Sequence, residues 1–229
     1  MVSGTYDTNR DTQRIQKGPI MNVLLINGSP HQNGCTNAAL EEIAKTLTEQ
    51  GIDSTIAWIG RDPIRGCQAC GSCSKTGSGQ CVFDDDIVNA LIEQAANADG
   101  IIVGSPVYYS GANGALTCVL DRMFYAGGAR LRHKPAAAIA SARRAGTTAT
   151  IMRLNQYFLF NNMPVVPSSY WTMVHGSAAD EVAQDEEGLH TMRTLARNMA
   201  WMLECFEAGS DAGIDIPELE PKRWTNFIR

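Results

Sequence analysis

The chain has 229 residues, of which 44% are hydrophobic and 19% charged, so a disordered segment and a small disulfide scaffold are both excluded. Its formal net charge of −5 disfavours nucleic-acid binding, because no basic face is available to neutralise phosphates. No apolar run approaches the roughly 20 residues that span a bilayer, and no secretory signal is recognisable, so we expect no membrane association. Seven cysteines without an export signal favour the cytoplasm, where clustered thiols bind metal or carry out redox chemistry.

From Met21 onward, apolar segments alternate with helical patterns. We take 1–20 as an N-terminal extension, 21–208 as one α/β domain and 209–229 as a C-terminal tail. Strands are predicted at 21–27, 53–59, 100–105, 135–141 and 163–166. Helices are predicted at 36–50, from 84–86 onward, around 116–123, at 148–160 and along a final apolar face from Met192 to Phe206. This alternation predicts right-handed βαβ crossovers and a doubly wound, five-stranded parallel sheet with helices on both faces.

Ligands in such folds bind beyond the carboxyl ends of the strands. The first of these loops reads NGSPHQNGCTN (27–37) and leads straight into a helix. Free N–H groups and the helix dipole favour an anion there. The loop lacks the lysine of a nucleotide P-loop and the GxGxxG of a dinucleotide fold, so it suits one monophosphate held by neutral donors, or else it is a simple helix start.

The loops after the third and fourth strands complete this edge. SPVYYSGANGAL (105–116) carries two adjacent tyrosines that suit a planar ring, although adjacent tyrosines are also common in ordinary packing. SARRAGTT (141–148) carries two arginines. These face either solvent or an anionic ligand such as the phosphates of a nicotinamide cofactor.

Taken together, the three loops resemble the flavodoxin-like NAD(P)H-dependent FMN reductase family. The similarity rests on GSPHQNGCTN (28–37), where the family more usually has GSPRxxGNT, and on SPVYYSGANGALTCVLDR (105–122). It covers about 21–205. It implies strand order 2-1-3-4-5, FMN as cofactor, NAD(P)H as co-substrate, and a homodimer or homotetramer.

The resemblance also implies which residues bind FMN. The phosphate would be surrounded by Ser29, His31, Cys35, Thr36 and Asn37. The isoalloxazine ring would be lined by Pro106, Val107, Tyr108 and Tyr109. The other side would be closed by Ser141, Ala142, Arg143, Arg144 and Gly146.

A cysteine-rich loop at 60–84 separates the second strand from the next helix. It contains Cys67, Cys70, Cys73 and Cys81 in the spacing Cys-x2-Cys-x2-Cys-x7-Cys, and connections in such folds are normally much shorter. Four thiolates in this spacing suit one soft metal centre but do not identify the metal. An iron–sulfur cluster, structural zinc and metal-free redox-active thiols all remain open. The motif resembles that of iron–sulfur flavoproteins of the same superfamily, which implies a [4Fe–4S] cluster near FMN.

The leading functional hypothesis is therefore an FMN-dependent oxidoreductase. It would pass electrons from NAD(P)H through flavin to a quinone, free flavin, metal complex or partner protein. The first alternative is an iron–sulfur flavoprotein that carries electrons between a cluster, FMN and another protein. The second is a binding module whose cysteines sense redox state or metal. No constellation of acid, base or nucleophile competes with the flavin, so we assign no catalytic side chain.

Overall fold

A central sheet separates two helical layers in the computed structural model, which describes residues 21–218, 220, 221, 223 and 225. The strands are β1 (Asn22–Asn27), β2 (Asp53–Trp58), β3 (Gly100–Tyr108), β4 (Gly111–Ala112), β5 (Ala136–Ala142) and β6 (Met173–His175). The helices are α1 (Cys35–Glu49), α2 (Ser72–Thr76), α3 (Val88–Asn97), α4 (Gly114–Gly127), α5 (Thr147–Phe160), α6 (Ala179–Val182) and α7 (Glu186–Asp211), with a 3-10 turn at Gly128–Arg130. The proposed extension at 1–20 lies outside the described residues.

The sheet order is β2-β1-β3-β5-β6, and its pairings are all parallel. The two-residue β4 lies off this path and pairs with β3 in the antiparallel direction. Counted over the parallel strands alone, the order is the expected 2-1-3-4-5. The flavodoxin-like doubly wound fold class predicted from the sequence is therefore confirmed.

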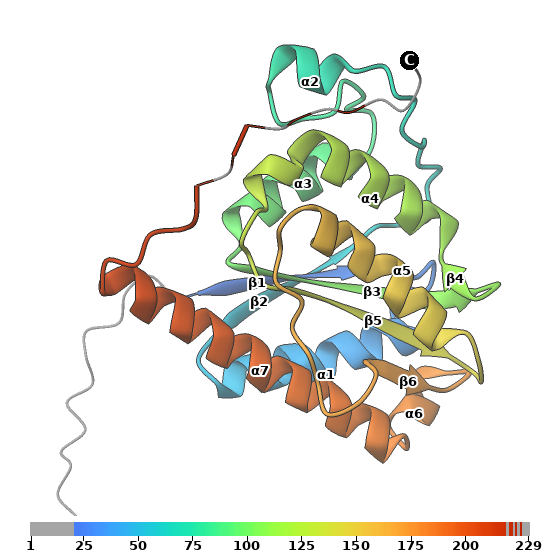
Figure 1. Cartoon of the computed structure of the whole chain (residues 1–229). Coiled ribbons are helices and arrows are strands. Elements are labelled where there is room, and N and C mark those ends of the chain that lie inside the picture. The colour runs from blue at the N-terminus through green and yellow to red at the C-terminus, as the bar shows by residue number, and fades with distance from the viewer. Residues whose placement is uncertain (1–20, 219, 222, 224, 226–229) are drawn as a thin grey trace, which may run out of the picture.

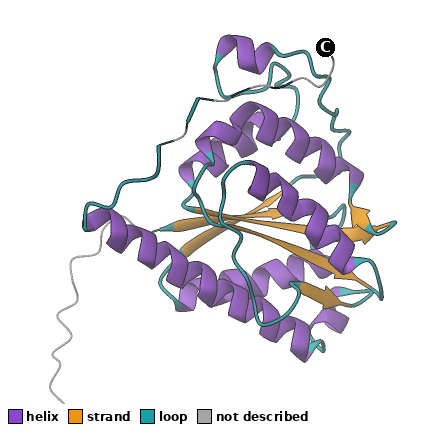
Figure 2. Cartoon of the chain, viewed as in Figure 1, coloured by secondary structure: helices purple, strands orange, loops and turns teal. Residues whose placement is uncertain are grey.

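The two faces of the sheet carry separate hydrophobic cores, because successive strand residues point to opposite sides. Leu24, Ile26 and Val103 pack with the buried stripes of α3, α4 and α5. Val23, Leu25 and Ile102 pack with those of α1 and α7. Figure 1 shows α3–α5 on one side of the sheet and α1 and α7 on the other, and Figure 2 shows the strands as a continuous middle layer.

The strand predicted at 163–166 is wrong, and the strand predicted at 100–105 continues to Tyr108, so Pro106 and Val107 belong to β3 and not to the loop after it. Residues 163–166 do not form the fifth strand: Val165 makes only an isolated bridge to Ala136, and the edge position beside β5 is taken by β6. Pro164 and Pro167 flank this bridge, and proline cannot donate to a strand ladder. The short β4 was also missed, because two residues give no periodic signal.

The predicted helices are close to their expected positions, with two differences, while the short helices α2 and α6 were not predicted. The helix expected from 84–86 begins at Val88, and Asp86 lies just before it with its carboxylate accepting the Val88 N–H. The last helix buries Met192, Leu195 and Met199 as expected, but Phe206 is largely exposed. No described helix combines the length and apolar character needed to cross a membrane.

Candidate functional site

The loop after β1 is held in shape by one buried side chain at the end of that strand. The Asn27 amide donates to the Gln32 carbonyl at 3.0 Å and to Asn37 Oδ1 at 3.2 Å, while its own oxygen accepts the Ser29 N–H. Ser29 Oγ in turn accepts the His31 N–H at 3.1 Å. The loop is thus preorganised before any ligand binds.

The first turn of α1 is open to an anion. Gly34 is the N-cap, no side chain caps the helix, and its first turn contains no acidic residue. The N–H groups of the first three helical residues therefore have no partner within the helix and lie at the positive end of its dipole. Burial raises the pKa of the Cys35 thiol, which donates to the Gly176 carbonyl, so this position adds no negative charge.

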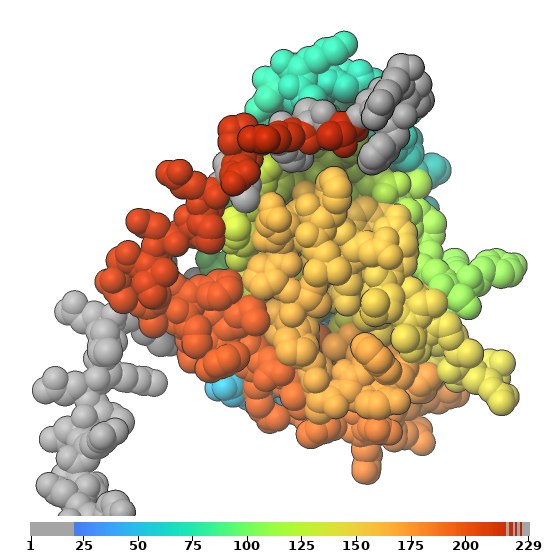
Figure 3. Space-filling model, viewed as in Figure 1, coloured from blue at the N-terminus to red at the C-terminus, as the bar shows by residue number. Residues whose placement is uncertain are grey.

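The loop after β3 is a tight hairpin closed by β4. Tyr108 pairs with Gly111, which leaves Tyr109 and Ser110 at the turn with φ of 51° and 59°. Two consecutive positive φ values are usual for Asn-Gly turns and costly for a tyrosine, and such strain clusters at functional sites. Tyr109 is fully exposed at the tip, and Figure 3 shows the hairpin projecting from the body.

A buried hydrogen bond joins the first loop to the third. Thr36 Oγ1 and Ser141 Oγ lie 2.8 Å apart, and Ser141 lies beside Pro106 in the parallel register. A Cβ on Gly146 would lie 2.8 Å from Val107 Cγ1, so the third loop also packs closely on the second. Three segments far apart in sequence therefore meet at one edge of the sheet, as Figure 1 shows.

The predicted FMN-binding residues divide into buried and exposed groups. Those that shape the edge are buried, and they are Ser29, Thr36, Asn37 and Ser141. The others are partly or fully exposed, and they are His31, Cys35, Pro106, Val107, Tyr108, Tyr109, Ala142, Arg143, Arg144 and Gly146. Unpaired helix N–H groups and neutral hydroxyls suit a phosphate monoester, and the tyrosines offer aromatic surface beside it. The residues present thus fit FMN.

Two residues of this edge were missed in the sequence. Trp58, the last residue of β2, donates from its indole Nε1 to the Ser29 carbonyl at 2.7 Å. Arg61 donates from Nε to the Pro30 carbonyl at 2.7 Å, which places a guanidinium against the loop that lacks a lysine. Their position at and just after the end of β2 could have indicated that they lie at this edge, because adjacent parallel strands end at the same edge of the sheet.

The cysteine-rich loop forms a separate lobe over α3 and α4, visible above these helices in Figures 1 and 3. Its four cysteines, Cys67, Cys70, Cys73 and Cys81, all line one small cavity. Hydrogen bonds from the Ser72 side chain and backbone lower the pKa of the Cys70 thiol. Gly71 and Gly77, both with positive φ, cap the one-turn helix α2 that carries Cys73.

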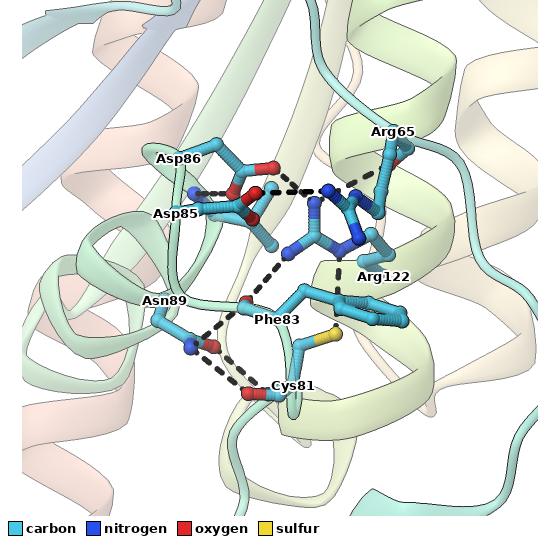
Figure 4. A network of polar contacts seen from close by, with 8 residues as sticks. Arg65, Cys81, Phe83, Asp85, Asp86, Asn89 and Arg122 are labelled. Carbon is cyan, nitrogen blue, oxygen red and sulfur yellow. Dashed lines mark hydrogen bonds and ion pairs between the residues drawn. The ribbon is translucent and has the colours of Figure 1, made fainter.

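Cys81 is the most firmly held of the four. The Asn89 side chain accepts its N–H at 2.8 Å and donates to its carbonyl at 2.9 Å. The buried Arg122 donates from Nε to Cys81 Sγ at 3.3 Å and forms an ion pair with Asp86. Figure 4 shows these residues of α3, α4 and the loop converging on one point.

The four cysteines share one cavity, but they do not surround a single point. Among the described residues, no group of three or more His, Cys, Asp or Glu side chains is close enough to hold one metal ion. A zinc site needs four sulfurs about 2.3 Å from one atom. A [4Fe–4S] cluster instead bonds each thiolate to a different iron, so four thiols around a shared cavity are compatible with it.

Sequence comparison relates the chain to flavin reductases. Residues 21–178 match the sequence profile of the NADPH-dependent FMN reductase family. An iron–sulfur flavoprotein of Methanocaldococcus jannaschii is 31% identical over 195 residues, which span 82% of this chain and 100% of that protein. An iron–sulfur flavoprotein of Methanosarcina thermophila is 26% identical over 196 residues, spanning 83% and 100%.

Solved structures show the same fold at low sequence identity. RosB with bound 8-demethyl-8-formylriboflavin-5'-phosphate aligns with a TM-score of 0.65 and 13% identity, over 91% of this chain and 94% of that one. A flavodoxin from the domain Archaea aligns with a TM-score of 0.55 and 15% identity, over 80% and 99%. Both likenesses support the flavodoxin-like architecture of the sheet.

Proposed function

Because the chain belongs to the NADPH-dependent FMN reductase family, and is thus an FMN-dependent oxidoreductase, we propose that its FMN binds where the loops after β1, β3 and β5 meet. The observation that carries this placement is the Thr36–Ser141 hydrogen bond beside the uncapped start of α1. It brings an anion site next to a hairpin that presents two tyrosines. When bound, FMN supplies the ring that takes electrons from the nicotinamide and passes them on.

The protein's own residues then have distinct parts in the proposal. Thr36, Asn37 and the helix N–H groups bind the phosphate, and the neutral Cys35 thiol avoids repelling it. Pro106, Val107 and the two tyrosines that follow support the ring. Arg143 and Arg144, both exposed after β5, receive the phosphates of the nicotinamide donor, since guanidinium groups pair well with phosphate oxygens.

FMN and riboflavin differ only in the phosphate, so paired titrations test this placement. The exposed Asn33 immediately precedes the helix N-cap, and Asn33→Asp adds a negative charge with little change in shape. We expect about a fivefold loss of FMN affinity from charge repulsion near the surface, with riboflavin affinity unchanged. Equal effects on both ligands, or none on FMN, would place the phosphate elsewhere.

We propose further that Cys67, Cys70, Cys73 and Cys81 hold a [4Fe–4S] cluster. Their shared cavity supports this, as does the likeness to iron–sulfur flavoproteins along their whole length. Anaerobic reconstitution should give about four iron and four sulfide per chain, and Cys73→Ser should lower both. The matched control is Cys205→Ser, because Cys205 is exposed on α7 outside the loop. Unchanged iron in Cys73→Ser, or zinc in place of iron, would refute the cluster.

The same cavity favours a second candidate function, an electron carrier that exchanges electrons between cluster, FMN and a partner protein. Anaerobic mixing with NADPH or NADH separates the two. Rapid bleaching of the flavin absorbance supports the reductase. A flavin that nicotinamides do not reduce, but that reduced ferredoxin does, supports the carrier.

We also propose an oligomeric state, a class of electron acceptor and a cellular location for this protein. Tyr125 and Leu159 are exposed and line the same pocket, which supports an interface with further copies, as a homodimer or homotetramer. Light scattering of the purified holoprotein measures that state. The acceptor is a small molecule or protein, and the cytoplasmic location remains a prediction from the cysteine usage.

A further inference from the structure

Arg122 is the largest fully buried side chain of the described chain, with 1% of its surface exposed. Burying a guanidinium is costly unless its charge is paired and its donors are satisfied. The Asp86 carboxylate pairs with it, and the carbonyls of Arg65 and Phe83 accept from its two terminal nitrogens at 3.3 Å and 2.7 Å. These three contacts anchor the loop to α4.

Another of its five N–H donors has a different target. Nε–H points to Cys81 Sγ at 3.3 Å, as Figure 4 shows. This bond is not needed to fix the backbone, because Asn89 already bonds both the N–H and the carbonyl of Cys81. The Arg122–Cys81 hydrogen bond therefore orients and polarises the sulfur atom, which is the atom that would bind iron.

We propose that Arg122 is a positioning residue that orients the Cys81 sulfur and raises the reduction potential of the group bound there. The inference rests on the proposed four-cysteine cluster site. One-electron reduction increases the negative charge shared by a cluster and its thiolates. A donor fixed on one thiolate stabilises that charge more in the reduced form than in the oxidised form.

Arg122→Lys tests the inference with the positive charge retained. A lysine ammonium can still pair with Asp86, but it has no second donor at the position of Nε. Reconstituted protein is poised anaerobically with dithionite, and the cluster and FMN are followed by EPR and absorbance. At the wild-type cluster midpoint we expect about a tenfold fall in the ratio of reduced to oxidised cluster, because one hydrogen bond to a charged acceptor is lost. This corresponds to a midpoint about 59 mV more negative.

The control is Arg193→Lys, the same substitution in an ion pair with Glu42 on the other face of the sheet. It should leave the cluster midpoint unchanged, and the FMN midpoint should be the same in both variants. A cluster midpoint and EPR spectrum in Arg122→Lys identical to wild type would overturn the inference.

Failures of the two proposals are distinguishable. Wild-type protein that takes up no iron and sulfide refutes the cluster itself, whereas a normal cluster with an unchanged midpoint in Arg122→Lys refutes only the role of Arg122. If Arg122→Lys does not fold, pulsed EPR on reduced wild-type protein with isotope-labelled arginine decides. Coupling between the cluster and an arginine nitrogen supports the inference, and its absence overturns it.

Discussion

Gly28→Ala tests how closely the proposed phosphate loop is packed against the sheet. Gly28 follows β1, and its N–H donates to the Gly104 carbonyl at 2.9 Å. A Cβ at Gly28 would lie 2.8 Å from that oxygen and 2.5 Å from Leu116 Cδ2. The Leu116 side chain is buried in the core, and Gly104 lies in the middle of the sheet between β1 and β5, so neither neighbour has room to move.

The expected cost follows from those contacts. Overpacking of this kind costs about 1–3 kcal/mol, and the strained hydrogen bond to Gly104 adds about 1 kcal/mol. We therefore expect the free energy of unfolding to fall by about 3 kcal/mol. The displaced loop should bind FMN about tenfold more weakly, because hydrogen bonds to a charged phosphate are each worth about 1.5–3 kcal/mol.

Urea unfolding of the apoprotein and fluorescence titration with FMN measure the two effects. Gly114→Ala is the matched control. Gly114 is the first residue of α4, and a Cβ there would meet nothing within 4 Å. This control should be neutral or stabilise by about 0.5–1 kcal/mol. Equal losses in the two variants, or full stability and FMN affinity in Gly28→Ala, would refute the packing argument.

Three further perturbations test other parts of the structure. Ser141→Ala should weaken FMN binding several-fold, because it removes the buried hydrogen bond of about 1 kcal/mol that orients Thr36. Thr36→Val should weaken it further, because it also removes the hydroxyl proposed to bind the phosphate, and the double variant should lose no more than Thr36→Val alone in fluorescence titrations. The hydrogen bond from Arg130 holds the pKa of the Glu93 carboxyl at about 2. The Glu93–Arg130 ion pair therefore stabilises the fold fully above the ordinary pKa of a glutamate, and this stabilisation is lost as the pH falls toward 2. The difference in Tm between wild type and Glu93→Gln should shrink over that pH range. Lys134→Met removes the ammonium that bonds the carbonyls at the end of α3, and urea unfolding should show a loss of about 2 kcal/mol; wild-type stability would contradict this capping role.

The fold was predictable where a segment is buried on both sides. The central residues of β1, β3 and β5 form continuous apolar runs, which are typical of strands covered on both faces of a parallel sheet. The edge strand was not predictable. Residues 163–166 are as apolar as a strand, but two flanking prolines remove the N–H groups that a ladder needs, and the three-residue β6 has no pattern long enough to detect.

The candidate site was predictable only in part, for a similar reason. Loops at the carboxyl ends of adjacent strands lie close together, so the strand order implied by the resemblance already predicts that the three loops proposed to bind FMN meet. The Arg122–Cys81 contact joins a helix to a loop forty-one residues away, and no local pattern connects them. The end of β2 indicated that Trp58 and Arg61 lie at this edge, but not that they would donate hydrogen bonds to the carbonyls of the loop after β1.

We propose that this chain carries both an FMN at the sheet edge and a cluster in the cysteine-rich loop. The most direct test is an anaerobic absorbance spectrum of the purified protein, with FMN, iron and sulfide quantified on the same sample. We expect a flavin double band on a broad iron–sulfur absorbance, with about one FMN, four iron and four sulfide per chain. A flavin spectrum with neither iron nor sulfide after reconstitution, or no flavin at all, would contradict it.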